Sequence, residues 1–203
     1  HPIGVIGGGT MGAGIAQTAS KAGWPVKLFD IDQALVDQAK ENIAKRFVRL
    51  VEKGQITVEE SIACQARITT TTSLEHLSDC DLIIEAIVED FDIKTKVLKE
   101  LGALASDAIL ATNTSSLSVS ELGTACGFGD RVVGMHFFNP APLMPLVEVI
   151  RGKESSEPAV QRATLLAEAW GKTVVQVSDT PGFIVNRVAR PYYLESWRII
   201  EDN

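Results

Sequence analysis

Cysteine is scarce in this chain, and the few cysteines present form no recognisable pattern. The 203 residues include three, Cys64, Cys80 and Cys126, which are widely spaced and contain no C-x-x-C pair. An odd, scattered set argues against a disulfide framework and against a metal site, so we expect no bound metal. Unpaired cysteines are typical of a reducing compartment, and we expect a cytoplasmic protein.

Basic residues and long apolar runs are also in short supply. Lys and Arg total 19 against 26 Asp and Glu, which gives a formal net charge of −7. This balance argues against nucleic acid or an acidic membrane surface as the main partner. No apolar run is long enough for a membrane span, and the opening residues show no signal-peptide pattern. The sequence also lacks internal repeats and low-complexity segments.

A glycine-rich turn is the most informative feature that the sequence does contain. Residues 4–12 read Gly-Val-Ile-Gly-Gly-Gly-Thr-Met-Gly, with the spacing Gly7-x-Gly9-x-x-Gly12, and Asp30 closes the next apolar run. Strand, glycine turn, helix, second strand and acidic residue together indicate a dinucleotide-binding βαβ unit. Gly7 allows the tight turn, Gly9 lets the backbone approach a pyrophosphate, and Gly12 lets the helix lie close on the strand. The alternative is a tight strand-to-helix turn that binds no ligand.

We expect the pyrophosphate at the start of the first helix, where Thr10 and Met11 follow the turn. Free backbone N–H groups and a partial positive charge attract anions to such a helix end. Asp30 is expected to accept hydrogen bonds from both ribose hydroxyls. Its charge would repel a 2′-phosphate, so the sequence favours NAD over NADP.

Strand-like and helix-like segments alternate, which predicts an α/β fold with a Rossmann-like, mostly parallel sheet. Apolar residues between positions 36 and 51 recur by threes and fours, and a second helical pattern begins near Thr57. We therefore expect a helix pair inserted between the second and third strands. The strands are predicted at residues 3–6, 26–29, 68–71, 82–86, 109–112, 132–135, 146–150 and 174–177, and helices near Thr10, Asp32, Val58, Phe91, Val119, Glu157 and Phe183.

A polar turn at residues 178–182, Ser-Asp-Thr-Pro-Gly, predicts a domain boundary. We expect a Rossmann domain over residues 1–181. Residues 182–203 are expected to form the first helix of a truncated helical C-terminal domain, because their apolar positions have no obvious partner before the turn. The chain begins without Met and ends inside a helical pattern, so we interpret it as a piece of a longer protein.

Three polar clusters lie at or near the ends of predicted strands. The string Asn-Thr-Ser-Ser-Leu at 113–117 follows a buried strand, where it would serve either a ligand or a helix N-terminus. The string His-Phe-Phe-Asn-Pro at 136–140 offers His136 as a proton acceptor or as a hydrogen-bonded structural residue. Glu148, within the apolar segment 146–150, is either solvent-facing or buried. A buried Glu148 needs a partner, for which His136 on the neighbouring strand is the natural candidate.

Together with the glycine turn, these clusters resemble the NAD-dependent 3-hydroxyacyl-CoA dehydrogenases, enzymes of fatty acid β-oxidation. The final residues, 186–198, are similar to bacterial members that act on 3-hydroxyadipyl-CoA in phenylacetate breakdown. The resemblance implies oxidation of a 3-hydroxyacyl-CoA to the 3-ketoacyl-CoA by hydride transfer to NAD, and a full-length homodimer formed through the C-terminal domain. The matching strings are at residues 5–16, 85–89, 113–117, 136–140, 146–150 and 179–187, in the family's order and spacing.

The resemblance also implies a role for each matching position. His136 corresponds to the catalytic base, and Glu148 to the carboxylate that orients it. Ser115 and Asn186 correspond to groups near the substrate's hydroxyl and thioester. Further implied contacts are Glu89, Lys94, Ser115 and Asn139 for the cofactor and Lys53, on the inserted helices, for CoA.

Two other functions are compatible with a dinucleotide-binding fold. One is a non-catalytic NAD-binding structural or sensing protein, which would have no need for a proton acceptor such as His136. The other is a dehydrogenase of a free 3-hydroxy acid, in which a helical Lys usually handles the proton. The pairing of His136 with Glu148 argues against both.

Overall fold

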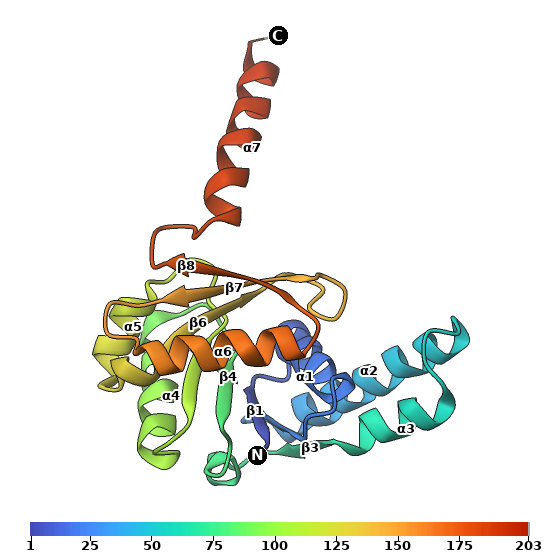
Figure 1. Cartoon of the computed structure of the whole chain (residues 1–203). Coiled ribbons are helices and arrows are strands. Elements are labelled where there is room, and N and C mark those ends of the chain that lie inside the picture. The colour runs from blue at the N-terminus through green and yellow to red at the C-terminus, as the bar shows by residue number, and fades with distance from the viewer. Residues whose placement is uncertain (203) are drawn as a thin grey trace.

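The computed structural model describes residues 1–202 and shows a single eight-stranded sheet with helices on both faces (Figure 1). The strand order is β3-β2-β1-β4-β5-β6-β7-β8, and every neighbouring pair is parallel except β6 and β7. The predicted Rossmann-like sheet is confirmed. The strands are β1 (Ile3–Ile6), β2 (Val26–Phe29), β3 (Ile68–Thr71), β4 (Leu82–Glu85), β5 (Ile109–Thr112), β6 (Val132–Phe137), β7 (Leu146–Arg151) and β8 (Thr173–Ser178).

Two apolar cores lie on the two faces of this sheet. One joins the sheet to α1, α2, α3 and α6, and the other joins it to α4 and α5. The central strands β1, β4 and β5 are buried along their whole length, which explains their nearly continuous apolar sequences. The helices are α1 (Thr10–Lys21), α2 (Gln33–Glu52), α3 (Val58–Ala66), α4 (Phe91–Leu104), α5 (Val119–Cys126), α6 (Glu157–Ala169) and α7 (Val185–Glu201), with short 3-10 turns at Leu74–Leu77 and Gly129–Arg131.

The glycine turn lies between β1 and α1, where the strand order changes direction between β1 and β4. In open α/β sheets, ligands bind at this position, beyond the carboxyl ends of the strands. Gly7 has φ +107°, and a Cβ there would lie 2.7 Å from the carbonyl oxygen of Ala86. A Cβ on Gly12 would overlap the carbonyl oxygen of Gly7, whereas a Cβ on Gly9 would meet nothing within 4 Å. The turn therefore packs closely against neighbouring backbone at Gly7 and Gly12 and leaves open space at Gly9.

The predicted helix pair between β2 and β3 is present as α2 and α3, which extend to one side of the sheet (Figure 1). Asp32 caps α2 by accepting a hydrogen bond from the amide of Ala34. Thr57 and Glu60 form a capping box at the start of α3. These are the local signals by which the two starts can be predicted from sequence.

Strand β6 is longer than the sequence predicts. The predicted strand ends at residue 135, but β6 continues to Phe137, so His136 lies within the strand and not after it. Antiparallel pairing with β7 explains the extension, because His136 pairs with Glu148 and Phe137 with Val147. The predictions for the last two strands, 146–150 and 174–177, are also too short by one or two residues, whereas the strand predicted at 82–86 ends one residue earlier, at Glu85.

The last helix begins later than predicted and projects from the body of the molecule (Figure 1). It starts at Val185, because Phe183 has φ +51° and cannot belong to a right-handed helix. No residue of α7 is buried, and Val188 and Trp197 are 70% and 65% exposed. None of the helices within residues 1–202 is both long and apolar enough to cross a membrane. The domain boundary near residue 181 stays a prediction.

The two glycines of the turn offer a matched pair of variants. Gly12→Ala is expected to lower the free energy of unfolding by about 1–3 kcal/mol, because its Cβ collides with rigid backbone. Gly9→Ala, at an ordinary φ of −67°, is expected to leave stability nearly unchanged and to weaken dinucleotide binding about 10-fold or more. Chemical denaturation and calorimetric titration measure the two effects. Equal stability loss in both variants would contradict this account of the turn.

Candidate functional site

A buried pair formed by His136 and Glu148 is the centre of the candidate site. The two residues face each other on β6 and β7, and His136 Nδ1 lies 2.7 Å from Glu148 Oε2. They are 6% and 1% exposed, so the solvent-facing alternative for Glu148 is wrong. A carboxylate only accepts hydrogen bonds, so Nδ1 carries the proton in this pair. The second ring nitrogen, Nε2, is then an acceptor available to a ligand.

The other oxygen of Glu148 holds the start of α7. Oε1 accepts hydrogen bonds from the backbone amides of Ile184 and Val185, each at 2.9 Å. A negative charge at this helix end is also favoured by the helix dipole. The imidazole of His136 is further confined by two aromatic rings, with centroids 4.6 Å away for Phe138 and 5.6 Å away for Phe183. One buried carboxylate therefore fixes both the histidine and the turn into the last helix.

The turn that follows β5 is organised by Glu89. Its Oε1 accepts hydrogen bonds from the Thr114 hydroxyl at 2.6 Å and from the amides of Ser115 and Ser116 at 2.9 and 3.1 Å. Partial burial raises the pKa of Glu89, but these hydrogen bonds and the nearby Lys94 ammonium outweigh it and lower the pKa overall. Glu89 thus remains charged and holds the turn in place.

Lys94 lies behind Glu89 and is only 1% exposed. Its Nζ lies 2.6 Å from Glu85 Oε1 and 3.4 Å from Glu89 Oε2. Glu85 itself is fully buried, and its Oε2 accepts a hydrogen bond from the Thr112 hydroxyl at 2.8 Å. The structure therefore gives the Lys94 amine partners within the protein, and its direct contact with the cofactor stays a prediction. The sequence analysis missed Glu85, although a charge that closes the buried strand β4 is a signal for it.

Ser115 and Asn186 are 71 residues apart in the sequence and meet at this site. The Asn186 side-chain amide lies 3.5 Å from the carbonyl oxygen of Ser115. The neighbouring Asn113 joins the turn to β6, because its Oδ1 accepts a hydrogen bond from the amide of Phe137 at 2.9 Å. The structure thus brings together the first two predicted clusters and the start of α7.

The start of α1 is suited to a phosphate group. Helices α2 to α6 each begin with a side chain that caps a backbone amide, whereas α1 has no such cap. The uncapped amides of α1 and the open space at Gly9 fit a pyrophosphate. Asp30 lies beside the turn, and its Oδ2 accepts a hydrogen bond from the amide of Gly8 at 2.7 Å. The remaining lone pairs of Asp30 are available for ribose hydroxyls.

A cavity of about 360 Å³ extends from this turn toward the inserted helices. Its lining includes Thr10 of α1, Asn139, and Arg46 and Arg49 of α2. The sequence analysis missed both arginines because helix periodicity alone does not say which side of α2 faces the sheet edge. Lys53 is exposed at the C-terminal end of α2 and does not line this cavity.

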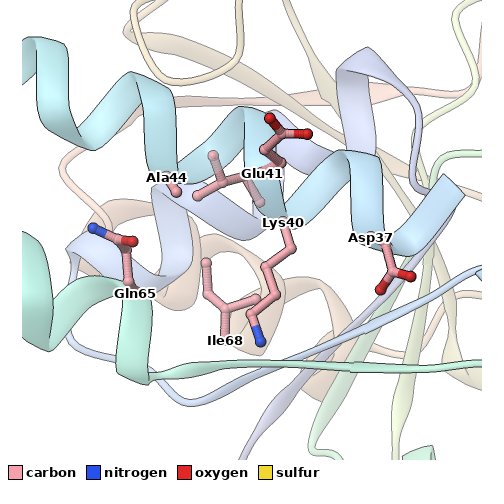
Figure 2. Close-up of a pocket in the computed structure, with 7 residues that line it drawn as sticks. Asp37, Lys40, Glu41, Ala44, Gln65 and Ile68 are labelled. Carbon is pink, nitrogen blue, oxygen red and sulfur yellow. The ribbon is translucent and has the colours of Figure 1, made fainter. Parts of the chain in front are cut away.

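A second pocket, of about 310 Å³, lies between α2 and the segment that joins α3 to β3 (Figure 2). Asp37 and Glu41 flank it together with Lys40, so its rim carries charges of both signs. None of its lining residues belongs to the three polar clusters or to the glycine turn. It is therefore separate from the candidate site.

Replacement of Glu148 by Gln tests the role of the carboxylate. The amide oxygen of Gln can still accept from Ile184 and Val185, which turns its NH₂ group toward His136 Nδ1. We expect the neutral imidazole to switch to the tautomer with its proton on Nε2, and the free energy of unfolding to fall by about 1–3 kcal/mol. Nitrogen-15 spectra of the ring report the tautomer. Glu157→Gln, at an exposed ion pair, is the control, and an unchanged tautomer in Glu148→Gln would contradict the proposed geometry.

Comparisons with known proteins identify the family to which the chain belongs. Residues 2–180 match the family model described as 3-hydroxyacyl-CoA dehydrogenase, NAD binding domain. A probable 3-hydroxybutyryl-CoA dehydrogenase of Deinococcus radiodurans is 45% identical over 196 residues, which cover 96% of this chain and 70% of that protein. The 3-hydroxyadipyl-CoA dehydrogenase of Escherichia coli is 41% identical over 201 residues, which cover 98% of this chain and 42% of that protein.

Solved structures give the same result. The crystal structure of 3-hydroxybutyryl-CoA dehydrogenase from Escherichia coli has a TM-score of 0.97 at 40% identity and covers 100% of this chain and 43% of that one. The (S)-3-hydroxybutyryl-CoA dehydrogenase from Ralstonia eutropha has a TM-score of 0.97 at 37% identity, over 99% of this chain and 71% of that one. The chain therefore belongs to the 3-hydroxyacyl-CoA dehydrogenase family, of which it carries the NAD-binding domain.

Proposed function

We propose that the protein oxidises a 3-hydroxyacyl-CoA to the 3-ketoacyl-CoA with NAD as the hydride acceptor and His136 as the proton acceptor. The observation that carries the proposal is the buried hydrogen bond of 2.7 Å between His136 and Glu148. It lies at the carboxyl end of β6, the same edge of the sheet at which the glycine turn leaves β1. A non-catalytic NAD-binding protein has no need for a buried proton acceptor at that edge.

The tautomer of His136 determines where the proton of the substrate's hydroxyl group goes. With Nδ1–H donated to Glu148, the lone pair of Nε2 can accept the proton of the substrate's hydroxyl group. When bound, NAD would supply the acceptor for the hydride that leaves the substrate's third carbon. The products are a ketone, the reduced cofactor and a charged imidazolium at His136, so protons and electrons balance.

Glu148 stabilises the charge that His136 acquires. The carboxylate is buried and in direct contact with the ring, so the attraction is weakly screened by water. The arrangement parallels the acid of a Ser-His-Asp triad, which orients the imidazole and stabilises its charged form. The amides of Ile184 and Val185 hold the same carboxylate and prevent it from turning away.

The remaining predicted residues supply binding and orientation. We assign Ser115 and Asn186 to the substrate's hydroxyl and thioester oxygens, because both lie at the turn that Glu89 holds rigid. Asp30 is assigned to the ribose of NAD, and its negative charge disfavours NADP. We assign Asn139 to the nicotinamide end.

The cavity beside α2 is the proposed site for the anionic arm of CoA. Arg46 and Arg49 line it, and no Asp or Glu is among the residues that the structure places around it. In a chain of net charge −7, this is a local exception that suits phosphate groups. Lys53, at the exposed end of the same helix, is positioned to extend this contact.

The exposed apolar residues of α7 support a further proposal about the whole protein. Tyr192, Leu194 and Ile200 are 60–74% exposed, which is unusual for a surface that faces only water. We propose that α7 opens a helical C-terminal domain, that the full-length protein is a homodimer formed through this domain, and that it acts in the cytoplasm.

His136→Gln tests the proposed reaction most simply. Turnover of a 3-hydroxyacyl-CoA is expected to fall by about 10²–10⁴-fold, because the proton acceptor is lost, while NAD affinity stays nearly unchanged. Absorbance of the reduced nicotinamide measures turnover, with the free 3-hydroxy acid as a second substrate. His76→Gln, at an exposed histidine, is the control. Near-normal turnover in His136→Gln would remove His136 from the mechanism, and a preference for the free acid would overturn the assigned substrate.

A further inference from the structure

A buried lysine supports the loop that joins β6 to β7. Lys172 lies in the turn between α6 and β8 and is 9% exposed. Its Nζ donates to the carbonyl oxygens of Ala141 at 2.6 Å and Met144 at 2.8 Å. Both carbonyls belong to the loop at residues 138–145, so one side chain connects two points of that loop to a distant part of the chain.

This ammonium group is held without a countercharge. Within residues 1–202, no Asp or Glu forms an ion pair with Lys172. Burial lowers the pKa of Lys172, and the positive charge of Lys21 lowers it further. A lysine is rarely buried without a partner, because desolvation of its charge is costly. The two carbonyl oxygens are the groups that offset this cost.

The loop is supported at its buried Ala141 and at Pro145, whose carbonyl oxygen accepts a hydrogen bond from the amide of Thr173 at 2.8 Å, and it borders two cavities. Pro142 and Leu143 line the cavity of about 360 Å³ beside α2. They also line a different cavity, of about 480 Å³, which Lys172 borders. The loop touches α1 where helix and loop approach closely, because a Cβ on Gly14 would lie 3.2 Å from Ala141 and Pro142 side-chain atoms. Among the contacts of the loop, Lys172 is the side chain that bonds two of its carbonyl oxygens at once.

We propose that Lys172 is a positioning residue that holds the 138–145 loop so that Asn139 reaches the cofactor. Asn139 is the second residue of this loop and, with Thr10 of α1, lines the cavity whose α2 side is assigned to CoA. A loop free to lift away from α1 would move Asn139 away from the phosphate end of that helix. The proposal rests on the assignment of Asn139 to the nicotinamide end of NAD.

Lys172→Met tests the proposal, because Met keeps the length of the side chain and removes the charge and the donors. We expect the amides of Leu143 and Met144, which bond the carbonyl of Pro140, to exchange hydrogen faster than in the unmodified protein. The Kd for NAD is expected to rise about 10-fold. Lys21→Met is the matched control, since Lys21, like Lys172, borders the cavity of about 480 Å³. This variant should leave both loop exchange and the Kd for NAD unchanged.

A purely structural role for Lys172 predicts a different result. In that case Lys172→Met would lower the melting temperature but leave loop exchange and the Kd for NAD as they are, which would overturn the proposal. Lys172→Arg, which keeps a charged donor, should restore NAD binding at least in part. If Lys172→Met does not fold, nitrogen-15 spectra of the unmodified protein decide: a slowly exchanging ammonium signal from Lys172 supports the proposal, and a rapidly exchanging one refutes it.

The same experiment separates this proposal from the proposed reaction. Loop exchange and NAD affinity are measured without any thioester substrate. If the unmodified protein oxidised no 3-hydroxyacyl-CoA, the proposed reaction would be wrong, while the comparison of Lys172→Met with Lys21→Met would still determine what Lys172 does.

Discussion

The rest of the site depends on the hydrogen bonds that the buried carboxylate of Glu148 accepts. A buried charge is tolerated only when its oxygens are satisfied, and here one oxygen faces His136 while the other accepts two backbone amides. The antiparallel pairing of β6 with β7 brings the two side chains directly opposite each other. The antiparallel pairing of β6 with β7, within a sheet whose other strand pairs are parallel, therefore creates the contact between His136 and Glu148.

The two proposed phosphate-binding places carry groups that attract anions, whereas the chain as a whole has a net negative charge. The chain is acidic overall, yet the start of α1 carries uncapped amides and the cavity beside α2 carries two arginines. Phosphate groups are attracted to both places by local charge and by free N–H donors. Two buried cations elsewhere have partners within the protein: Lys94 is paired with Glu85, and Lys172 bonds to loop carbonyls.

Most of the fold could be predicted from the sequence because its signals are local. Buried parallel strands appear as short apolar runs, and capping residues such as Asp32 and Thr57 mark where helices begin. The end of β6 could not be predicted, since it depends on pairing with β7 across a long loop. The late start of α7 could not be predicted either, because Phe183 has a left-handed φ that is rare for a residue other than glycine and lies against His136, far away in the sequence.

The site residues that belong to recognisable sequence motifs could be predicted. Those that long-range contacts bring to the site were harder to predict. His136 could be proposed as the partner of Glu148 if Glu148 is buried, but strand alternation left the burial of Glu148 open. The involvement of Arg46 and Arg49 could not be predicted, because it depends on how α2 packs against the sheet edge. Glu85 carried a signal, a charge at the end of a buried apolar strand, but its pairing with Lys94 depends on how α4 packs. A crystal structure with NAD and acetoacetyl-CoA tests the central claim most directly. The account predicts His136 Nε2 at about 3 Å from the keto oxygen, with Nδ1 still on Glu148. A ring turned away from that oxygen, or a dinucleotide bound away from the glycine turn, would contradict it.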